Sequence, residues 1–322
     1  MSTYTAVAHT NIALIKYWGK KDPQLIIPYN SSLSLTLDQF YTKTTVTPAT
    51  TDQFTLDAQP ITGPGLTKMT AFLDILRAYA KTDQKLAVTS TNHVPTAAGL
   101  ASSASGLAAL TVAATAALGL NLPKQTLSRL ARRGSGSACR SIYGGFVEWQ
   151  KGQTDEDSYG VPLNPAETTD LDIAMIALVI SDTAKTVSSR QGMANTVATS
   201  PFYPAFVQRC EADLTAIKAA IAAKDLQQVG EIAEANALKM HATMLAATPP
   251  FSYFLPETLQ AIAAIQQLRT QGYLCYFTMD AGPNIKIICA ASQSQRIAQA
   301  LKKLLPKVAM VIAKPGPGAK LI

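Results

Sequence analysis

One stretch of the sequence constrains the fold more than any other, residues 95–105, which read Pro-Thr-Ala-Ala-Gly-Leu-Ala-Ser-Ser-Ala-Ser. The β-type run 86–90 precedes it, and the run 104–118, rich in small residues, predicts a helix after it. A strand, a glycine-containing loop and a helix N-terminus form a site for an anion, because the free N–H groups of the first helical turn and the helix dipole both favour a phosphate. The glycine permits close approach of a ligand to the backbone, and the serines add hydroxyl donors.

The same stretch excludes two common nucleotide-binding loops. It lacks the Gly-Lys-Ser/Thr of a Walker loop, and it lacks the Gly-x-Gly-x-x-Gly of a dinucleotide site. The residues alone leave open whether the stretch binds a phosphate or is an ordinary helix start capped by serine.

The composition favours a globular protein with an anionic partner. The chain has 322 residues, of which 48% are hydrophobic, and this length predicts one or two domains. Its net charge of +7 suits phosphorylated metabolites, nucleotides or nucleic acid. The lysines and arginines are scattered, without a basic tail or a basic helix with interleaved aromatic residues, so nucleic-acid binding is not expected.

The cysteines and the apolar segments indicate a cytoplasmic protein without a membrane partner. Four cysteines lie far apart with no CxxC pair, and only three histidines accompany them, so we expect a reduced environment and no structural zinc site. The first residues lack the charged and apolar regions of a signal peptide. The most apolar run, 171–180, is too short to span a bilayer and contains Asp172, so it predicts a buried strand.

The order of elements predicts an α+β fold in two domains, with a boundary near residue 185 and two layers in each domain. The segment 33–37 alternates apolar and polar residues, which predicts a half-buried strand, and the β-branched segment 42–47 is expected to pair with it. Two long helices are expected at 202–223 and 225–247. The other expected elements are strands at 4–16, 86–90, 146–149, 171–180, 273–278, 284–290 and 307–313, helices at 66–80, 104–118, 256–271 and 292–305, a helix opened by Pro123, and a surface loop at 151–168.

Three further stretches combine cations with hydroxyl groups. Lys16, Tyr17 and Lys20 follow the first strand, where Lys16 would steer a carboxylate and Lys20 would meet a phosphate, unless they are solvated surface residues. The stretch 133–140, Arg-Gly-Ser-Gly-Ser-Ala-Cys-Arg, offers backbone amides to an anion and a guanidinium to a carboxylate, or is a flexible turn. The stretch 185–190, Lys-Thr-Val-Ser-Ser-Arg, is either part of the same site or a polar helix start.

A carboxylate in the last third of the chain is the candidate base. Asp280 stands at the end of a β-type run, in the stretch 278–284, Thr-Met-Asp-Ala-Gly-Pro-Asn. A carboxylate at this place is either a general base or a turn residue that accepts hydrogen bonds from local amides. The residues alone leave both interpretations open.

Taken together, these stretches resemble the diphosphomevalonate decarboxylase family over nearly the whole chain. That family belongs to a superfamily of small-molecule kinases with galactokinase, homoserine kinase, mevalonate kinase and phosphomevalonate kinase. The loop after Pro95 is shared in outline by the superfamily, whereas the runs 17–20, 134–140 and 280–284 are much more specific. The other matching runs are 11–20, 30–32 and 187–193.

The resemblance implies a two-domain small-molecule-kinase fold, with an N-terminal half like a ribosomal-protein domain (residues 1–185) and a ferredoxin-like C-terminal half (residues 186–322). It implies ATP-dependent decarboxylation of (R)-5-diphosphomevalonate to isopentenyl diphosphate, carbon dioxide, ADP and phosphate. It also implies ATP and Mg²⁺ as cofactors and a homodimer as the assembly.

The resemblance further implies the role of each site residue. Asp280 would accept or orient the proton of the 3-hydroxyl, Lys16 would keep Asp280 ionised, and Arg140 would hold the substrate carboxylate. Ser103 and Mg²⁺ would hold the transferring phosphates. The nucleotide would bind Pro95, Ala98, Gly99, Leu100, Ala101, Ser102 and Ser103. The substrate would bind Tyr17, Trp18, Gly19, Lys20, Lys68, Ser135, Gly136, Ser137, Ala138, Cys139, Arg140, Ser189 and Arg190.

Two alternative functions belong to different classes. The nearer one is a 3-kinase of the mevalonate type, or a phosphomevalonate decarboxylase, of the same superfamily. The joint presence of Lys16, Arg140 and Asp280 favours the full decarboxylase. The more distant one is a catalytically silent sensor of a phosphorylated metabolite, which would not need Asp280.

Overall fold

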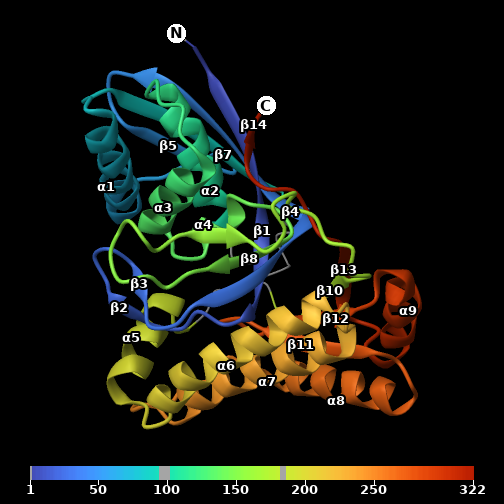
Figure 1. Ribbon diagram of the computed structural model, residues 1–322. Coiled ribbons are helices and arrows are strands. Elements are labelled where there is room, and N and C mark those ends of the chain that lie inside the picture. Colours follow the sequence, from blue (N-terminus) through green and yellow to red (C-terminus); the bar gives the residue numbers. More distant parts are fainter. Residues whose placement is uncertain (1, 94–101, 182–185) are drawn as a thin grey trace.

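The computed structural model describes residues 2–93, 102–181 and 186–322. Two lobes lie one above the other, and both ends of the chain lie at the upper lobe (Figure 1). The upper lobe is built around one large sheet and the lower lobe around a smaller one, with helices packed against each. This arrangement is the predicted two-domain α+β fold.

The large sheet has eight described strands. Its order is β14-β1-β4-β7-β5-β6, and β8 branches from β4 and pairs with β9. Neighbouring strands are antiparallel except β5 and β7, which are parallel. The bounds are β1 Tyr4–Ile15, β4 Ser32–Ala49, β5 Gln53–Leu56, β6 Gln59–Pro60, β7 Lys85–His93, β8 Phe146–Trp149, β9 Gly160–Pro162 and β14 Lys320–Leu321.

The predicted pairing of 33–37 with 42–47 is wrong, because both segments belong to the single long strand β4. Residues 38–41 contain no glycine or proline that would turn the chain, so the strand continues through them. β4 pairs with β1 on both sides of a register shift between His9 and Asn11, and this irregularity absorbs the change in alternation. The predicted loop at 151–168 also contains a short strand, β9.

Among the described residues, four helices of the upper lobe pack with the large sheet. They are α1 Gly63–Ala80, α2 Ser102–Ala117, α3 Lys124–Gly134 and α4 Ala138–Ser141. Four alanines of α2, Ala108, Ala109, Ala113 and Ala114, are fully buried and let this helix lie close to β1 and β4. α3 begins after Pro123, which is its N-cap residue. The predicted helices 66–80 and 104–118 are thereby confirmed.

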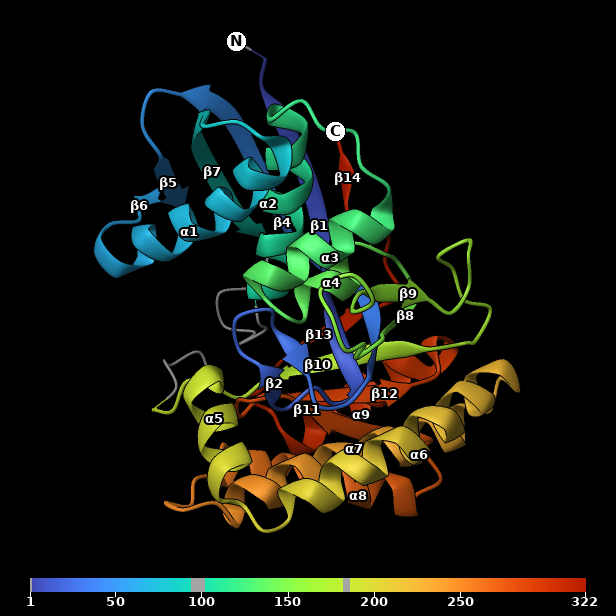
Figure 2. The same ribbon diagram turned by 60° about the vertical axis from the view of Figure 1, so that its left-hand side comes forward.

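The smaller sheet, which lies in the lower lobe (Figure 2), has helices packed on both of its faces. Its antiparallel order is β11-β12-β10-β13. Buried residues of α6 and α7 pack on one face, and those of α8 and α9 on the other, so this part has three layers and the prediction of two is wrong here. The bounds are β10 Ala174–Val179, β11 Cys275–Met279, β12 Ile285–Cys289, β13 Ala309–Ala313, α6 Tyr203–Ala222, α7 Leu226–Leu245, α8 Pro256–Thr270 and α9 Ser294–Leu304.

Four further elements complete the description of the fold. They are the hairpin of β2 (Lys20–Asp22) and β3 (Ile27–Pro28), helix α5 (Ser189–Thr199) and the 3-10 turn η1 (Ala291–Gln293). Within the described ranges, no helix is both long enough and apolar enough to cross a bilayer.

The strand pairing crosses the expected boundary near residue 185 in both directions. β10 lies before it and pairs in the smaller sheet, while β14 lies far after it and pairs with β1 in the large sheet. The division into 1–185 and 186–322 therefore stays a prediction about domains. Each side of this boundary contributes one strand to the sheet that is formed mainly by the other side.

The end of β1 is one place where the two lobes contact each other. One apolar cluster extends from β1 and β4 of the large sheet to β10, β12, α6 and α7 of the lower lobe. Thr278 Oγ1 donates a hydrogen bond to the carbonyl of Ala13 over 3.3 Å. The N–H of Lys16 donates to Asn236 Oδ1 on α7 over 2.9 Å. These contacts set the positions of the residues that follow β1.

We predict that Gly230→Ala destabilises the lower lobe. Gly230 lies on α7 where the helix crosses β11, and a Cβ atom there would lie 2.1 Å from Cδ2 of the buried Tyr276 ring. Such overpacking costs about 1–3 kcal/mol, measurable by urea unfolding. Gly106→Ala in α2 is the matched control, because its Cβ would meet no described atom within 4 Å, and its stability is expected to rise by up to about 1 kcal/mol. Equal effects of the two substitutions would contradict the packing argument.

Candidate active site

A cavity of about 460 Å³ lies at the junction of the two lobes. Its walls come from the residues after β1, the start of α2, the turn between α3 and α4, the start of α5 and the turn after β11. Six cationic side chains and, among the described residues, one carboxylate line it: Lys16, Lys20, Lys68, Arg140, Arg190, Lys286 and Asp280. This excess of positive charge suits a ligand with several negative charges.

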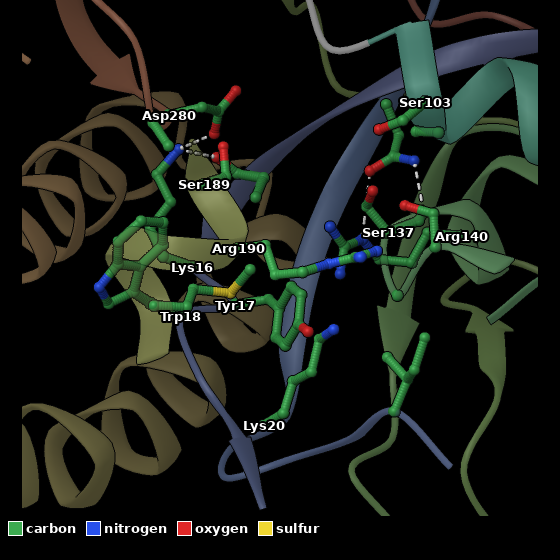
Figure 3. A pocket seen from close by; sticks show the side chains of 18 of the residues that line it. Lys16, Tyr17, Trp18, Lys20, Ser103, Ser137, Arg140, Ser189, Arg190 and Asp280 are labelled. Carbon is green, nitrogen blue, oxygen red and sulfur yellow. Dashed lines mark hydrogen bonds and ion pairs between the residues drawn. The ribbon is translucent and has the colours of Figure 1, made fainter. Parts of the chain in front are cut away.

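Lys16 and Asp280 form the closest ion pair of the cavity wall. Lys16 Nζ donates to Asp280 Oδ1 over 2.8 Å and to the carbonyl of Ala13 over 2.6 Å. The Lys16 side chain is 2% exposed and that of Asp280 36%, so the carboxylate faces the cavity and the ammonium group lies behind it. Burial lowers the pKa of Lys16, and Asp280 opposes that effect. The contact expected from the sequence is therefore present, as Figure 3 shows.

A buried polar network behind the cavity fixes the backbone of Lys16. Asn236 Oδ1 accepts the hydrogen bond from the Lys16 N–H, and its Nδ2 donates to Asp213 Oδ2 over 2.9 Å. Lys239 Nζ lies 2.6 Å from the same oxygen of Asp213. Because Asn236 is fully buried and has both ends engaged, it holds β1 against α7 in one orientation.

Arg140 is held by neutral groups. Its Nε donates to Asn11 Oδ1 over 3.2 Å and to Ser34 Oγ over 2.9 Å, and its Nη1 donates to Ser32 Oγ over 2.5 Å. Asn11 Nδ2 in turn donates to the carbonyl of Ser137, which ties the turn before α4 to β1. These partners orient the guanidinium without cancelling its charge, so the charge remains for a ligand carboxylate.

The turn that carries Asp280 has an internal hydrogen bond and a contact to the residues that follow β10. The N–H of Gly282 donates to the carbonyl of Asp280 over 2.8 Å. Asn284 Oδ1 accepts from the N–H groups of Ile180 and Ser181 over 2.7 and 2.9 Å. Asn284 is therefore a clamp between this turn and the end of β10, which explains why the motif ends in an asparagine.

Three cations gather at another part of the cavity. Burial, followed by the charges of Arg190 and Lys68, lowers the pKa of Lys20. Burial and Arg190 likewise lower the pKa of Lys68. Repulsion of this kind means that the three groups share one region, and an anion bound between them would relieve it. The phosphate site predicted for Lys20 would lie in this region, and that role stays a prediction.

The remaining predicted residues fall into three groups. Tyr17, Trp18, Ser103, Ser135, Gly136, Ser137, Ser189 and Arg190 line the cavity, and in Figure 3 Ser103, Ser137 and Arg140 lie across it from Lys16 and Asp280. Gly19, Ala138 and Cys139 are buried but do not belong to its lining, and burial raises the pKa of the Cys139 thiol to about 12. Pro95, Ala98, Gly99, Leu100 and Ala101 lie outside the described residues, as does the Ser102 side chain.

Tyr17 presents a polar atom that the described protein does not satisfy. Its ring packs on Trp149 at a centroid distance of 4.6 Å, and burial raises the pKa of its hydroxyl. Within the described part of the chain this buried hydroxyl has no hydrogen-bond partner. A buried hydroxyl on a cavity wall without a partner is suited to a ligand oxygen.

The sequence did not single out Asn11, Asn236, His241 or Lys286. Lys286 had a usable signal, because it is the one charged residue in the apolar run Ile-Lys-Ile-Ile-Cys of β12. Asn236 and His241 had no such signal in the sequence, because single polar residues are common in a long helix such as α7. Their importance arises from what α7 packs against.

Two sequence families match the chain. The family described as Diphosphomevalonate decarboxylase-like N-terminal domain matches residues 8–160, and the Mevalonate 5-diphosphate decarboxylase C-terminal domain matches residues 175–315. The diphosphomevalonate decarboxylase of Ganoderma lucidum is 37% identical over 335 residues, which span 95% of this chain and 84% of that protein. That of Saccharomyces cerevisiae is 35% identical over 333 residues, spanning 96% and 83%.

Solved structures show the same similarity. The mevalonate diphosphate decarboxylase of Staphylococcus aureus has a TM-score of 0.94 and 48% identity, over 99% of this chain and 98% of that one. A structure of MDDEF in complex with MVAPP, AMPPCP and magnesium has a TM-score of 0.94 and 50% identity, over 99% and 98%.

We predict that His241 makes the fold sensitive to acid. The side chain is 2% exposed, its Nε2 has no partner among the described residues, and burial, followed by the charge of Lys16, lowers its pKa from 6.5 to about 4. The unfolded chain therefore binds more protons between these values, so stability is lost as the pH falls from about 6.5 towards 4, by up to about 3 kcal/mol. In urea unfolding at pH 7 and pH 4.5, His241→Phe is expected to lose less stability than the wild type.

The exposed His93 provides the control, because His93→Phe is expected to keep the wild-type loss. An identical loss in wild type and His241→Phe would contradict this explanation.

Proposed function

The chain belongs to the diphosphomevalonate decarboxylase family, and we propose that the cavity between its lobes performs the ATP-dependent decarboxylation of (R)-5-diphosphomevalonate. The products are isopentenyl diphosphate, carbon dioxide, ADP and phosphate. The main structural support for placing the reaction in this cavity is the Lys16–Asp280 ion pair. The pair lines the same cavity as Arg140 and the N-terminus of α2.

The chemistry requires a leaving group at a tertiary carbon. The oxygen of the 3-hydroxyl attacks the γ-phosphorus of ATP and ADP leaves, while Asp280 accepts or orients the hydroxyl proton. The carbon–oxygen bond then breaks and releases phosphate. The electron pair of the bond to the carboxylate forms the alkene, and carbon dioxide departs. Lys16 keeps Asp280 ionised, since a nearby ammonium group favours the charged carboxylate.

Arg140 is proposed to hold the substrate carboxylate. Its guanidinium is oriented by Asn11, Ser32 and Ser34, which are neutral, and it is almost fully buried. A forked contact to the carboxylate would keep the breaking carbon–carbon bond aligned with the departing phosphate.

The substrate diphosphate is proposed to bind the cationic end of the cavity. Lys20, Lys68 and Arg190 supply charge there, and their mutual repulsion favours the binding of a polyanion. The hydroxyls of Tyr17, Ser137 and Ser189 line the same cavity and can donate to phosphate oxygens.

ATP is proposed to place its phosphates at the N-terminus of α2, where Ser103 lines the cavity. The complex of MDDEF with AMPPCP and magnesium supports ATP and Mg²⁺ as the cofactors. The described residues fit Mg²⁺, because the Ser103 hydroxyl is a hard oxygen ligand and Mg²⁺ binds mainly through nucleotide phosphates. When bound, Mg²⁺ supplies charge neutralisation at those phosphates. A homodimer remains a prediction from the family resemblance, and a cytoplasmic location remains a prediction from the scattered cysteines.

The coupling of two products tests the function. Incubation with ATP, Mg²⁺ and diphosphomevalonate is expected to release ADP and carbon dioxide in equal amounts. ADP without carbon dioxide, together with a 3-phosphorylated product, would indicate the kinase alternative. Mevalonate is expected to react far more poorly, because it lacks the diphosphate that Lys20, Lys68 and Arg190 are proposed to bind.

We predict that Asp280→Asn lowers turnover by about 10³-fold, the scale of losing a general base and its charge. The amide keeps the size and one acceptor for Lys16, so the protein is expected to fold, although two buried ammonium groups lose an anionic neighbour. Single-turnover ADP formation and a binding titration are the measurements, and affinity for ATP and substrate is expected to change only a few-fold. The exposed Asp83 gives the matched control Asp83→Asn, with normal turnover. Near-normal turnover in folded Asp280→Asn would disprove the role of Asp280.

A further inference from the structure

Lys286 is a buried charge in the middle of the lower lobe. All five residues of β12 are buried, and Lys286, at 3% exposed, is the one among them with a charge. β12 is an inner strand, paired with β11 on one side and β10 on the other, with Lys286 opposite Thr278 and Ala177. An apolar side chain would pack here without the cost of removing an ammonium group from water. The stability of the fold therefore does not explain why a lysine occupies this position.

The ammonium group of Lys286 reaches the turn that carries Asp280. Nζ donates to the carbonyl of Asn284 over 3.3 Å, at one end of the turn, and lies 3.7 Å from Asp280 Oδ2, at the other end. Lys286 also lines the cavity. Lys16 Nζ contacts the other carboxylate oxygen, Oδ1, over 2.8 Å. Two ammonium groups from two lobes therefore lie against the two oxygens of one carboxylate.

We propose that Lys286 is a positioning residue for the reaction, which holds the Oδ2 side of Asp280 while Lys16 holds the Oδ1 side. The inference rests on the proposed role of Asp280 as the group that accepts or orients the hydroxyl proton. The torsion that rotates a carboxylate about its last bond is soft, so one contact leaves its plane poorly defined. Two contacts on opposite oxygens fix the plane relative to the cavity.

Fixing that plane matters because proton transfer depends on geometry. A displacement of about 1 Å in a reacting group can cost about 10²-fold in rate. Lys16 belongs to the upper lobe, whereas Lys286 and Asp280 both belong to the β11–β12 hairpin of the lower lobe, so the Lys16 contact depends on the relative position of the lobes and the Lys286 contact does not. Lys286 thereby fixes the base within its own lobe, and Lys16 ties that orientation to the upper lobe.

The substitution that tests this role is Lys286→Met, which keeps most of the side-chain length and removes the charge. We expect kcat to fall about 10²-fold, while the dissociation constants of ATP and diphosphomevalonate stay within about threefold. Stability is expected to stay the same or rise, because a buried charge is removed and Asp280 keeps Lys16. The exposed Lys302 gives the matched control Lys302→Met, which is expected to keep the wild-type kcat.

The pH profile provides a readout that a purely structural lysine would not change. The charged groups facing this site are Asp280, Lys16 from the end of β1, Arg140 from α4 and His241 from α7. Arginine stays protonated in the alkaline range, and His241, with a pKa of about 4, is neutral there. The pKa values of Lys16 and Lys286 are lowered by burial, and Lys286 also lowers that of Lys16. Removing Lys286 should therefore raise the pKa of Lys16. The alkaline decline of kcat that follows the deprotonation of Lys16 should then move to higher pH.

The outcomes separate this proposal from the function itself. If wild type and Lys302→Met release no carbon dioxide, the proposed function fails and the role of Lys286 fails with it. If they react and Lys286→Met has normal kcat, or loses only substrate affinity, the positioning role alone is wrong. If Lys286→Met does not fold, Lys286→Gln is measured in its place, and a normal kcat with an unchanged pH profile in that variant overturns the proposal.

Discussion

The ion pair between Lys16 and Asp280 is the contact on which the rest of the site depends. It joins the end of β1 in the upper lobe to the turn after β11 in the lower lobe over 2.8 Å. A buried ammonium group is costly, and the fold offsets that cost with a carboxylate and the carbonyl of Ala13. The pair therefore forms only when both lobes are folded and docked, so the assembly of the site is tied to the assembly of the fold.

The other cationic side chains of the cavity have two different kinds of surroundings. Arg140 is held by neutral oxygens and keeps its charge for a carboxylate. Lys20, Lys68 and Arg190 repel one another and leave a region suited to phosphates. A substrate with a carboxylate at one end and a diphosphate at the other fits this division. Phosphoryl transfer relies mainly on positioning and charge stabilisation, which this arrangement supplies without a covalent intermediate.

Much of the fold and of the site could be predicted from the sequence. The long helices α6 and α7, the strand β1 and the helix α1 follow the periodicity of their own residues, because local burial patterns determine such elements. Asp280, Arg140 and Lys16 stood out because each lies in a run whose chemistry is unusual and whose order resembles a known family. The single strand β4 was missed, because a bulge shifted the alternation and suggested a turn that is absent.

The sequence by itself determined the two-domain α+β class, the family and the residue types of the site, since these reside in local patterns and motifs. Only the tertiary structure decided which residues support them. Asn236 acquires its role because α7 packs against the end of β1. Lys286 had a local signal, a charge in an apolar run, but its meaning depends on Asp280 meeting Lys16 from the other lobe. The tertiary structure likewise decided that β10 pairs in the smaller sheet and β14 in the large sheet. Contacts across tens or hundreds of residues depend on docking, and no local pattern in the chain encodes them.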